Sequence, residues 1–185
     1  GFELARQQVV VEHAHRLAFE RVRGSDSTVI MDMLDASSLL WRLKLHGVDV
    51  GDRWQRMAGA WEPRIDDAWY SFNDTHAMMA FAGAGRRDLA EQLLTVMSRT
   101  AAASTDNGTM TRTVGLPVAE AILAFAEGRY GEAVERLAPV KAIAARAGGS
   151  HAQRDLLAQT LLTAAEKSGQ YRLARSLLNE RLALK

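Results

Sequence analysis

Residues 128–137 read Gly128-Arg129-Tyr130-Gly131-Glu132-Ala133-Val134-Glu135-Arg136-Leu137, and two similar phrases occur elsewhere in the chain. This repetition indicates the architecture. One begins at Gly85, 43 positions earlier, and the other begins at Gly169, 41 positions later. An alanine follows each of the three glycines by five positions: Ala90, Ala133 and Ala174. Fixed periods of this length are typical of stacked supersecondary units, none of which can bury its apolar face alone. We therefore expect a repeat protein.

The composition favours helices over strands. Hydrophobic residues make up 48% of the 185 residues and charged residues 24%, a balance that is typical of folded proteins and excludes global disorder. Alanine and leucine are abundant, proline occurs only three times, and no segment alternates apolar and polar residues over a useful length. These features predict an all-α fold and argue against Rossmann and barrel folds.

Apolar residues at helical spacing divide the chain into paired helices. An N-terminal helix over 1–24 precedes four antiparallel pairs, so that about nine helices form a single helical-repeat domain over 1–185. The pairs cover about 28–62, 66–102, 115–147 and 150–184. We expect a loop over 104–109, and we expect Pro117 in the first turn of the helix that follows, because proline suits that position.

The phrase Gly-x-Tyr-x-x-Ala between paired helices resembles the tetratricopeptide repeat, although the units here exceed its period of about 34 residues. Five longer phrases resemble, in the same order, the C-terminal portion of the tetratricopeptide repeat protein 38 family. They are DASSLLWRL (35–43), GVDVGDRW (47–54), FNDTHA (72–77), GLP (115–117) and GGSHAQRD (148–155). The resemblance extends from about residue 30 to the end. It implies an all-α, tetratricopeptide-repeat-like α-solenoid, and it implies no reaction and no catalytic residue.

The richest polar cluster lies where the last helix pair begins. Ser150 and Gln153 have the spacing of a capping box, and Arg154 and Asp155 would then form ion pairs with neighbouring helices. In the functional alternative, His151 and Arg154 beside a helix N-terminus would attract an anion or a carboxylate. His151, Gln153, Arg154 and Asp155 are therefore candidate ligand-binding residues.

Asp74 and His76 form a second polar cluster. Residues two positions apart on a helix point in different directions, so they cannot form a dyad by themselves. We expect His76 to be buried and hydrogen-bonded between helices, and it would meet His151 only if both faced one groove. Asp74 and His76 are nevertheless candidate groove residues.

Charged residues of the first helix pair are secondary candidates: Asp35, Arg42, Asp52 and Arg53. In an apolar stretch they suggest partly buried ion pairs between helices, and in the alternative they form the wall of a ligand site. The four tryptophans, at positions 41, 54, 61 and 69, are expected to pack between helices. An exposed tryptophan among them would instead mark a partner surface.

Motifs for metal, cofactor and nucleophilic chemistry are missing from the sequence. Glu12, His13 and His15 lack the spacing of a His-Glu-x-x-His zinc site, and the chain has no cysteine. The sequence also contains no glycine-rich phosphate loop and no Gly-x-Ser-x-Gly elbow. We therefore expect no cofactor, no bound metal and no catalytic residue.

We expect a non-catalytic scaffold that binds a protein or peptide partner, or a second copy of itself as a homodimer, on a concave face. The formal net charge of +1 gives no reason to expect nucleic acid, and no apolar run reaches membrane-spanning length. A cysteine-free chain suits a reducing compartment, so we expect a cytoplasmic location. The alternative is a small-molecule binder or an enzyme that uses the His, Asp and Arg side chains in the groove. The chain begins at Gly1 without a methionine, and family members extend further upstream, so we expect a fragment that lacks upstream repeats.

Overall fold

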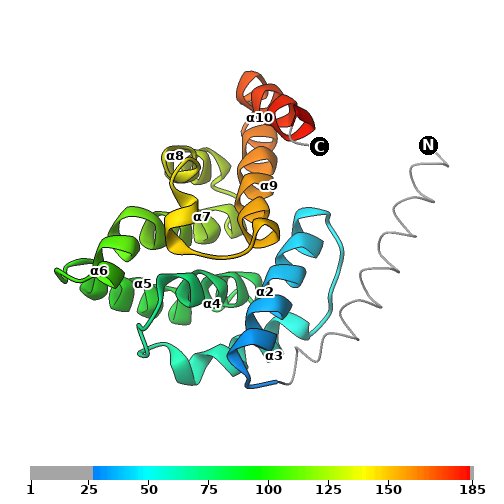
Figure 1. Ribbon diagram of the computed structural model, residues 1–185. Helices are drawn as coiled ribbons and strands as arrows, with labels where there is room; N and C mark the ends of the chain where they lie inside the picture. The colour runs from blue at the N-terminus through cyan, green and yellow to red at the C-terminus, as the bar shows by residue number, and fades with distance from the viewer. Residues whose placement is uncertain (1–26, 184–185) are drawn as a thin grey trace.

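The computed structural model describes residues 27–183, except for the side chains of residues 147 and 152, and this part of the chain consists of helices without strands (Figure 1). The α-helices are α2 (Ile30–Leu45), α3 (Arg53–Trp61), α4 (Ser71–Gly83), α5 (Arg87–Ala101), α6 (Asp106–Met110), α7 (Leu116–Ala126), α8 (Tyr130–Val140), α9 (His151–Lys167) and α10 (Tyr171–Ala183). All of these except α6 lie where helices were predicted, so the all-α prediction is confirmed. The helix predicted over 1–24, with Glu12, His13 and His15, lies outside the described residues.

The turns inside the four predicted helix pairs share one geometry. Each contains a glycine with a φ between 69° and 78°, and these are Gly47, Gly85, Gly128 and Gly169. The residue after each glycine donates its N–H to the carbonyl five positions earlier, as Arg129 donates to Ala124 at 2.8 Å. This pattern is the Schellman motif, which ends a helix with a left-handed residue that glycine adopts without strain. The repeated phrase therefore encodes a helix end followed directly by a new helix.

The alanines of the repeated phrase are buried, as a small residue between packed helices should be. Ala90 and Ala133 are fully buried, and Ala174 is 6% exposed. They belong to one hydrophobic core that also includes Trp41, Phe81 and other large side chains. A side chain of this size lets neighbouring helices approach closely without leaving a void.

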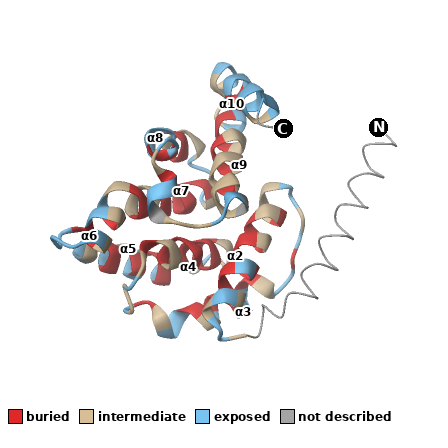
Figure 2. Ribbon diagram, viewed as in Figure 1, coloured by how far each residue is buried: buried red, intermediate tan, exposed pale blue. Residues whose placement is uncertain are grey.

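Helix α4 lies at the centre of the fold and contacts α2, α3, α5 and α7. Residues of every face of α4 are buried, whereas α10, which packs on α9, is largely exposed (Figure 2). Helices α2 and α9 are also in contact, and the indole Nε1 of Trp41 donates to Thr160 Oγ1 across that contact at 3.0 Å. The first and last helix pairs therefore meet, although they are far apart in the sequence.

The loop predicted over 104–109 is correct only for residues 104 and 105, because α6 begins at Asp106. Thr105 caps α6 by accepting a hydrogen bond from the backbone N–H of Gly108 at 3.0 Å, and α6 continues through a π-helical turn over Thr111–Gly115 into α7. Pro117 lies in the first turn of α7, as predicted, but the π-helical turn joins that turn to the helix before it. Proline in a helix interior clashes with the carbonyl four residues earlier, and the wider π-turn before it relieves that clash.

The predicted position of Trp69 within a helix is also wrong. The helix predicted from residue 66 begins at Ser71, and residues 66–70 form a turn in which Ala68 has a φ of 48°. Asn107 holds this turn from a distant helix, because its Nδ2 donates to the Ala68 carbonyl at 2.9 Å and its Oδ1 accepts from Ser71 N–H at 3.3 Å. Trp69 is consequently 72% exposed, whereas the other three tryptophans are buried.

The second helix of the third pair is shorter than predicted. It ends at Val140, one residue after Pro139, and a 3₁₀ turn over Ala144–Ala147 replaces its expected last turn. Proline removes a backbone donor from the ladder, which favours an early end. The loop that follows packs against α4 so closely that a Cβ added to Gly149 would lie 2.6 Å from Phe72 Cε2.

Candidate functional site

Three of the five family-like phrases meet in space. The phrase over 35–43 lies on α2, the phrase over 72–77 lies on α4, and the phrase over 148–155 forms the start of α9. His76 on α4 bonds Ser38 on α2, and the loop before α9 packs against Phe72. Helices α2 and α9 contact each other directly. The candidate residues His76, His151, Gln153 and Arg154 therefore belong to one region of the molecule.

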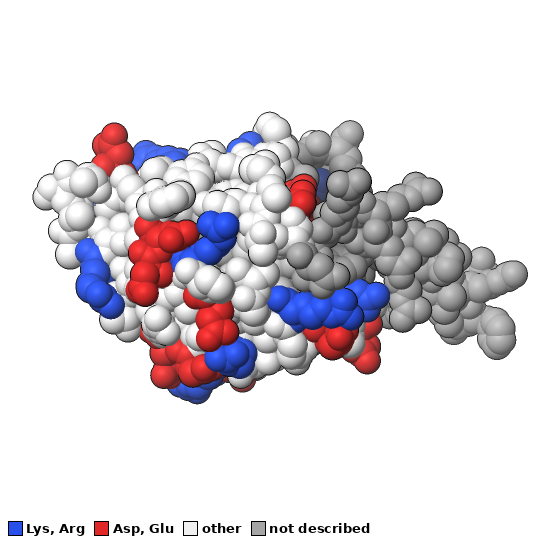
Figure 3. All heavy atoms as spheres, turned by 90° about the horizontal axis from the view of Figure 1, so that it is seen from below, with Lys and Arg blue, Asp and Glu red and all other residues white. Residues whose placement is uncertain are grey.

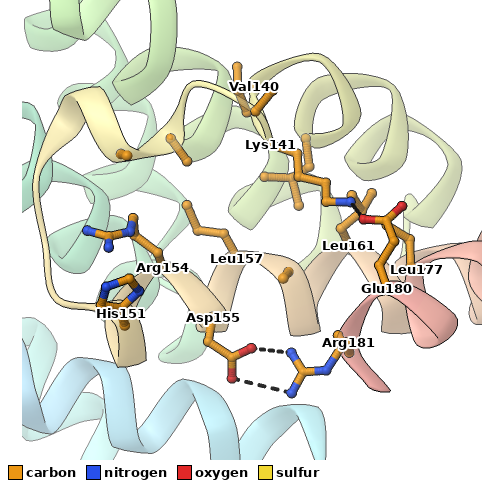
Figure 4. A pocket seen from close by; sticks show the side chains of 15 residues that line it. Val140, Lys141, His151, Arg154, Asp155, Leu157, Leu161, Leu177, Glu180 and Arg181 are labelled. Carbon is orange, nitrogen blue, oxygen red and sulfur yellow. Dashed lines mark hydrogen bonds and ion pairs between the residues drawn. The ribbon is translucent and has the colours of Figure 1, made fainter. Parts of the chain in front are cut away.

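A groove of about 350 Å³ lies in this region, between α8, the loop after it, α9 and α10 (Figure 4). Its apolar surface comes from Leu137, Val140, Leu157, Leu161 and Leu177. Cavities that bind small molecules or peptide side chains commonly have volumes of about 300 to 1,000 Å³ and a mainly apolar lining. The groove is therefore large enough to hold a ligand.

Two ion pairs cross the rim of the groove and tie α10 to its neighbours. Lys141 Nζ pairs with Glu180, and Arg181 donates to both carboxylate oxygens of Asp155 (Figure 4). All four side chains are partly exposed, so each pair contributes at most about 1 kcal/mol to stability. The sequence reading of Asp155 as an ion-pair partner of a neighbouring helix is confirmed.

One end of the groove is cationic. His151 and Arg154 project from the first turn of α9 side by side, as Figure 4 shows, and both line the groove. Arg154 Nη1 donates to the carbonyl of Gly149. Lys141 and Arg181 of the same groove are paired with Glu180 and Asp155, whereas Arg154 forms no ion pair with a described residue. Its position in the first turn of α9 therefore favours an anionic ligand group at this end.

Gln153 has a structural role. Its backbone N–H donates to Ser150 Oγ at 3.3 Å, and its side-chain Oε1 accepts from the Ser150 N–H at 2.7 Å. This reciprocal pair is the predicted capping box, which satisfies two otherwise free donors at the start of α9. Gln153 does not line the groove, and it contributes only by holding the helix start that presents His151 and Arg154.

His76 is buried and hydrogen-bonded between helices, as predicted. Its Nδ1 lies 2.8 Å from the Phe72 carbonyl, which can only accept, so Nδ1 carries the proton and Nε2 accepts from Ser38 Oγ at 2.9 Å. Burial lowers the pKa of His76 from 6.5 to about 4, with Arg42 adding to the decrease against the Phe72 hydrogen bond. The imidazole is therefore neutral near pH 7.

His76 and His151 line different hollows. His76 faces a cavity of about 30 Å³ together with Gln153 and Arg154, whereas His151 lies on the groove. A cavity of this size holds only a few water molecules at roughly 10–15 Å³ each. Ser38 and His76 have the hydrogen bond of a nucleophile and its base, but both side chains are buried.

Asp74 lies on a different side of α4 from His76, as the spacing of two residues predicted. It is 7% exposed, and its Oδ2 is buried without a hydrogen-bond partner in the described part of the chain. Burial, together with a smaller effect of the nearby charge of Asp67, raises the pKa of Asp74 from 3.8 to about 7. Asp74 lines a separate small hollow, so it is not part of the groove.

The secondary candidate residues also lie in different places. Arg42 is half-buried on α2, and burial lowers its pKa although Asp155 and Asp35 act in the opposite direction. Asp52 binds Arg56 on the exposed surface of α3 at 2.9 Å, and Arg53 donates to the Val50 carbonyl at 3.0 Å. Asp52 and Arg53 therefore make local contacts on the first helix pair and do not line the groove.

The sequence analysis missed three charged residues of the groove: Lys141, Glu180 and Arg181. Each belongs to an ordinary charged helix surface in the sequence, and its partner is 26 or 39 positions away. Exposed Trp69 was missed as well. The only signal for it was Asn107, whose capping role depends on tertiary contact.

Within residues 27–183, no group of three or more His, Asp or Glu side chains is placed to hold a metal ion. None of the helices described is both long and apolar enough to cross a lipid bilayer. No protein-family model matches the sequence. No solved structure matches the fold.

Proposed function

We propose that the chain is a non-catalytic, tetratricopeptide-repeat-like module, related to the tetratricopeptide repeat protein 38 family, that binds a peptide segment of a partner protein. The binding site is the groove between α8, α9 and α10. The observation that carries the proposal is the groove itself. It has a volume of about 350 Å³, an apolar floor and a rim of charged side chains. Repeat proteins of paired helices use such surfaces for peptide recognition.

The charges of the groove favour a particular ligand chemistry. Asp155 and Glu180 already have cationic partners, whereas His151 and Arg154 stand together at the N-terminal end of α9. A segment with one or two apolar side chains would fill the floor, and a carboxylate beside them would lie near Arg154. We therefore propose an acidic, apolar segment or a C-terminal carboxylate as the ligand.

The arrangement of helices supports a compact variant of the tetratricopeptide array. The shared glycine turns and buried alanines are those expected between stacked pairs. Helix α2 also reaches α9, a contact that an open solenoid with nearest-neighbour packing does not make. The binding surface is thus proposed at the last three helices and not along a long concave face.

A substitution that fills the groove with a larger side chain tests this function. Ala158 lines the groove, so Ala158→Trp is expected to occupy the space that a ligand needs. Ala138→Trp is the matched control, because Ala138 is exposed on α8 and does not line the groove. A displayed library of random peptides is selected on the wild-type protein, and the selected peptides are then measured on all three proteins by fluorescence anisotropy.

The expected peptides contain apolar residues next to Asp, Glu or a free C-terminus. Their affinity should fall at least about tenfold on Ala158→Trp, which corresponds to about 1.4 kcal/mol, and should be unchanged on Ala138→Trp. Equal binding to all three proteins, or selection of basic peptides, would contradict the proposed site. The small-molecule alternative predicts instead that a carboxylate with a short alkyl chain, such as octanoate, binds the wild type as tightly as the peptides do and is lost on Ala158→Trp.

A further inference from the structure

A second hollow lies on the other side of the central helix, away from the groove. It has a volume of about 20 Å³ and is bounded by α4, by the turn over 65–70, and by single residues of α2, α3 and α5. Its polar side chains are Arg64, Asp67, Asn73 and Asp74, and Trp69 stands at its edge. A space of this size accommodates one group as large as a water molecule or an ammonium, at roughly 10–15 Å³.

Trp69 is held at this edge by a strained turn. Ala68 is the one non-glycine residue of the described chain with a positive φ, 48°, a conformation that costs a residue with a Cβ about 1 kcal/mol or more. Asn107 stabilises the turn by accepting and donating hydrogen bonds on either side of Trp69 and Tyr70. A large aromatic side chain that is 72% exposed on such a support is a feature of binding surfaces.

Asp74 gives the hollow an unsatisfied acceptor. The residue is 7% exposed, and no donor of the described structure reaches its Oδ2. Arg64, the cation of the hollow, is already engaged, since it donates to the Thr28 carbonyl at 3.1 Å and lies 3.6 Å from Asp67. A buried carboxyl oxygen left without a partner costs about 1–3 kcal/mol, which a ligand donor would recover.

We propose that this hollow binds the ammonium group of a lysine side chain presented by a partner protein. The ammonium would pair with Asp74, and its positive charge would be attracted by the indole of Trp69. The ammonium alone would enter the hollow, beside Ile30, Trp61, Ala77 and Leu93, and the methylene groups of the lysine would remain outside it. The planar guanidinium of arginine is too large for the space, so the site distinguishes the two basic side chains.

Charges of both signs are mixed on the side of the molecule where α3 lies. Figure 3, which shows the molecule from the side of α3, has Lys and Arg side chains interspersed with Asp and Glu over the coloured part of the surface. The attraction for lysine is therefore local to the hollow. Its charged groups are Arg64 from the 3₁₀ turn, Asp67 from the following turn and Asp74 from α4, while α2, α3 and α5 contribute only uncharged side chains to it.

The test uses Nα-acetyl-lysine N-methylamide as the probe and the indole Nε1–H signal of Trp69 in ¹H–¹⁵N spectra as the readout. Wild-type protein should show a saturable shift of that signal. Nα-acetyl-norleucine N-methylamide, which lacks the charge, should not compete with the lysine probe, and the arginine analogue should bind at least about tenfold more weakly. Because Asp74 must be ionised to pair, affinity for the lysine probe should rise about tenfold from pH about 6 to pH about 8.

Asp74→Asn keeps the shape of the side chain and should weaken binding at least about tenfold. Asp66→Asn, which removes an exposed carboxylate of the same turn that does not line the hollow, is the matched control and should bind like the wild type. Trp69→Leu, monitored at the Asn73 backbone amide, provides a second variant on the surface and should also lose binding. Equal binding of the lysine and norleucine probes, an affinity independent of pH, or unchanged binding by Asp74→Asn would overturn the proposal, as would a hollow that holds only water in the wild type.

Discussion

Replacing Asp74 by asparagine is expected to stabilise the protein, and the gain should grow with pH. Burial, aided by Asp67, raises the pKa of Asp74 from 3.8 to about 7. An acid whose pKa rises on folding contributes its full stability below the unfolded pKa, and that contribution is lost as pH rises through the folded pKa. The window here lies between pH 3.8 and about 7. At about 1.4 kcal/mol per pKa unit, the wild type loses up to about 4 kcal/mol across it.

The measurement is urea unfolding of wild type and Asp74→Asn, followed by circular dichroism at several pH values between about 4 and 8. The difference in unfolding free energy should rise by up to about 4 kcal/mol over this range. His76 titrates in part of the same range, but both proteins contain it, so its contribution cancels in the difference. Asp66→Asn should differ from wild type by no more than about 0.5 kcal/mol at every pH, because Asp66 is exposed. A gain from Asp74→Asn that is the same at both ends of the range would refute the reasoning.

Three further predictions concern the packing and the buried polar groups. Gly115→Ala should destabilise the protein by about 1–3 kcal/mol, because its Cβ would lie 2.6 Å from a side-chain carbon of α4. Gly131→Ala, which has open space around it, should instead stabilise α8 by up to about 1 kcal/mol. Thermal unfolding should therefore show a lower melting temperature for the first variant and a higher one for the second. In the Asp74→Asn background, the protonation of His76 should lower the free energy of unfolding by about 3 kcal/mol as pH drops from 6.5 through about 4. Urea titrations should show that His76→Gln abolishes this decrease. Thr160→Val should cost about 1–3 kcal/mol by leaving a buried indole N–H unpaired, whereas Thr160→Ser should retain most of the stability; a Val variant as stable as the Ser variant would contradict the assigned hydrogen bond.

The two proposed sites differ in how much they destabilise the folded protein. The groove is rimmed by exposed ion pairs and demands little of the fold. The hollow at Asp74 combines a buried, unpaired carboxyl oxygen with positive φ at Ala68, and both destabilise the free protein. Substitutions that stabilise a protein while removing a function are expected at sites of this kind. Asp74→Asn should therefore improve stability and weaken lysine binding in the same molecule.

Signals confined to a few neighbouring residues were enough to predict the helices and their ends. The glycine turns at Gly85, Gly128 and Gly169, the capping box of Ser150 and Gln153, and the burial of His76 all follow from local sequence patterns. The predictions failed where local patterns were ambiguous. The phrase over 104–109 is polar and reads as a loop, yet Thr105 caps a short helix there.

The groove and the hollow were beyond reach of such patterns. The ion pair of Asp155 with Arg181 joins residues more than 25 positions apart, and so do the hydrogen bonds of Asn107 to the backbone around the 66–70 turn. Periodicity tells which face of a helix is apolar, because hydrogen bonding within the helix sets the spacing of its side chains. It does not tell which helix covers that face, how far α10 stands from α8, or that Asp74 is buried without a donor, because those depend on the packing of the whole chain.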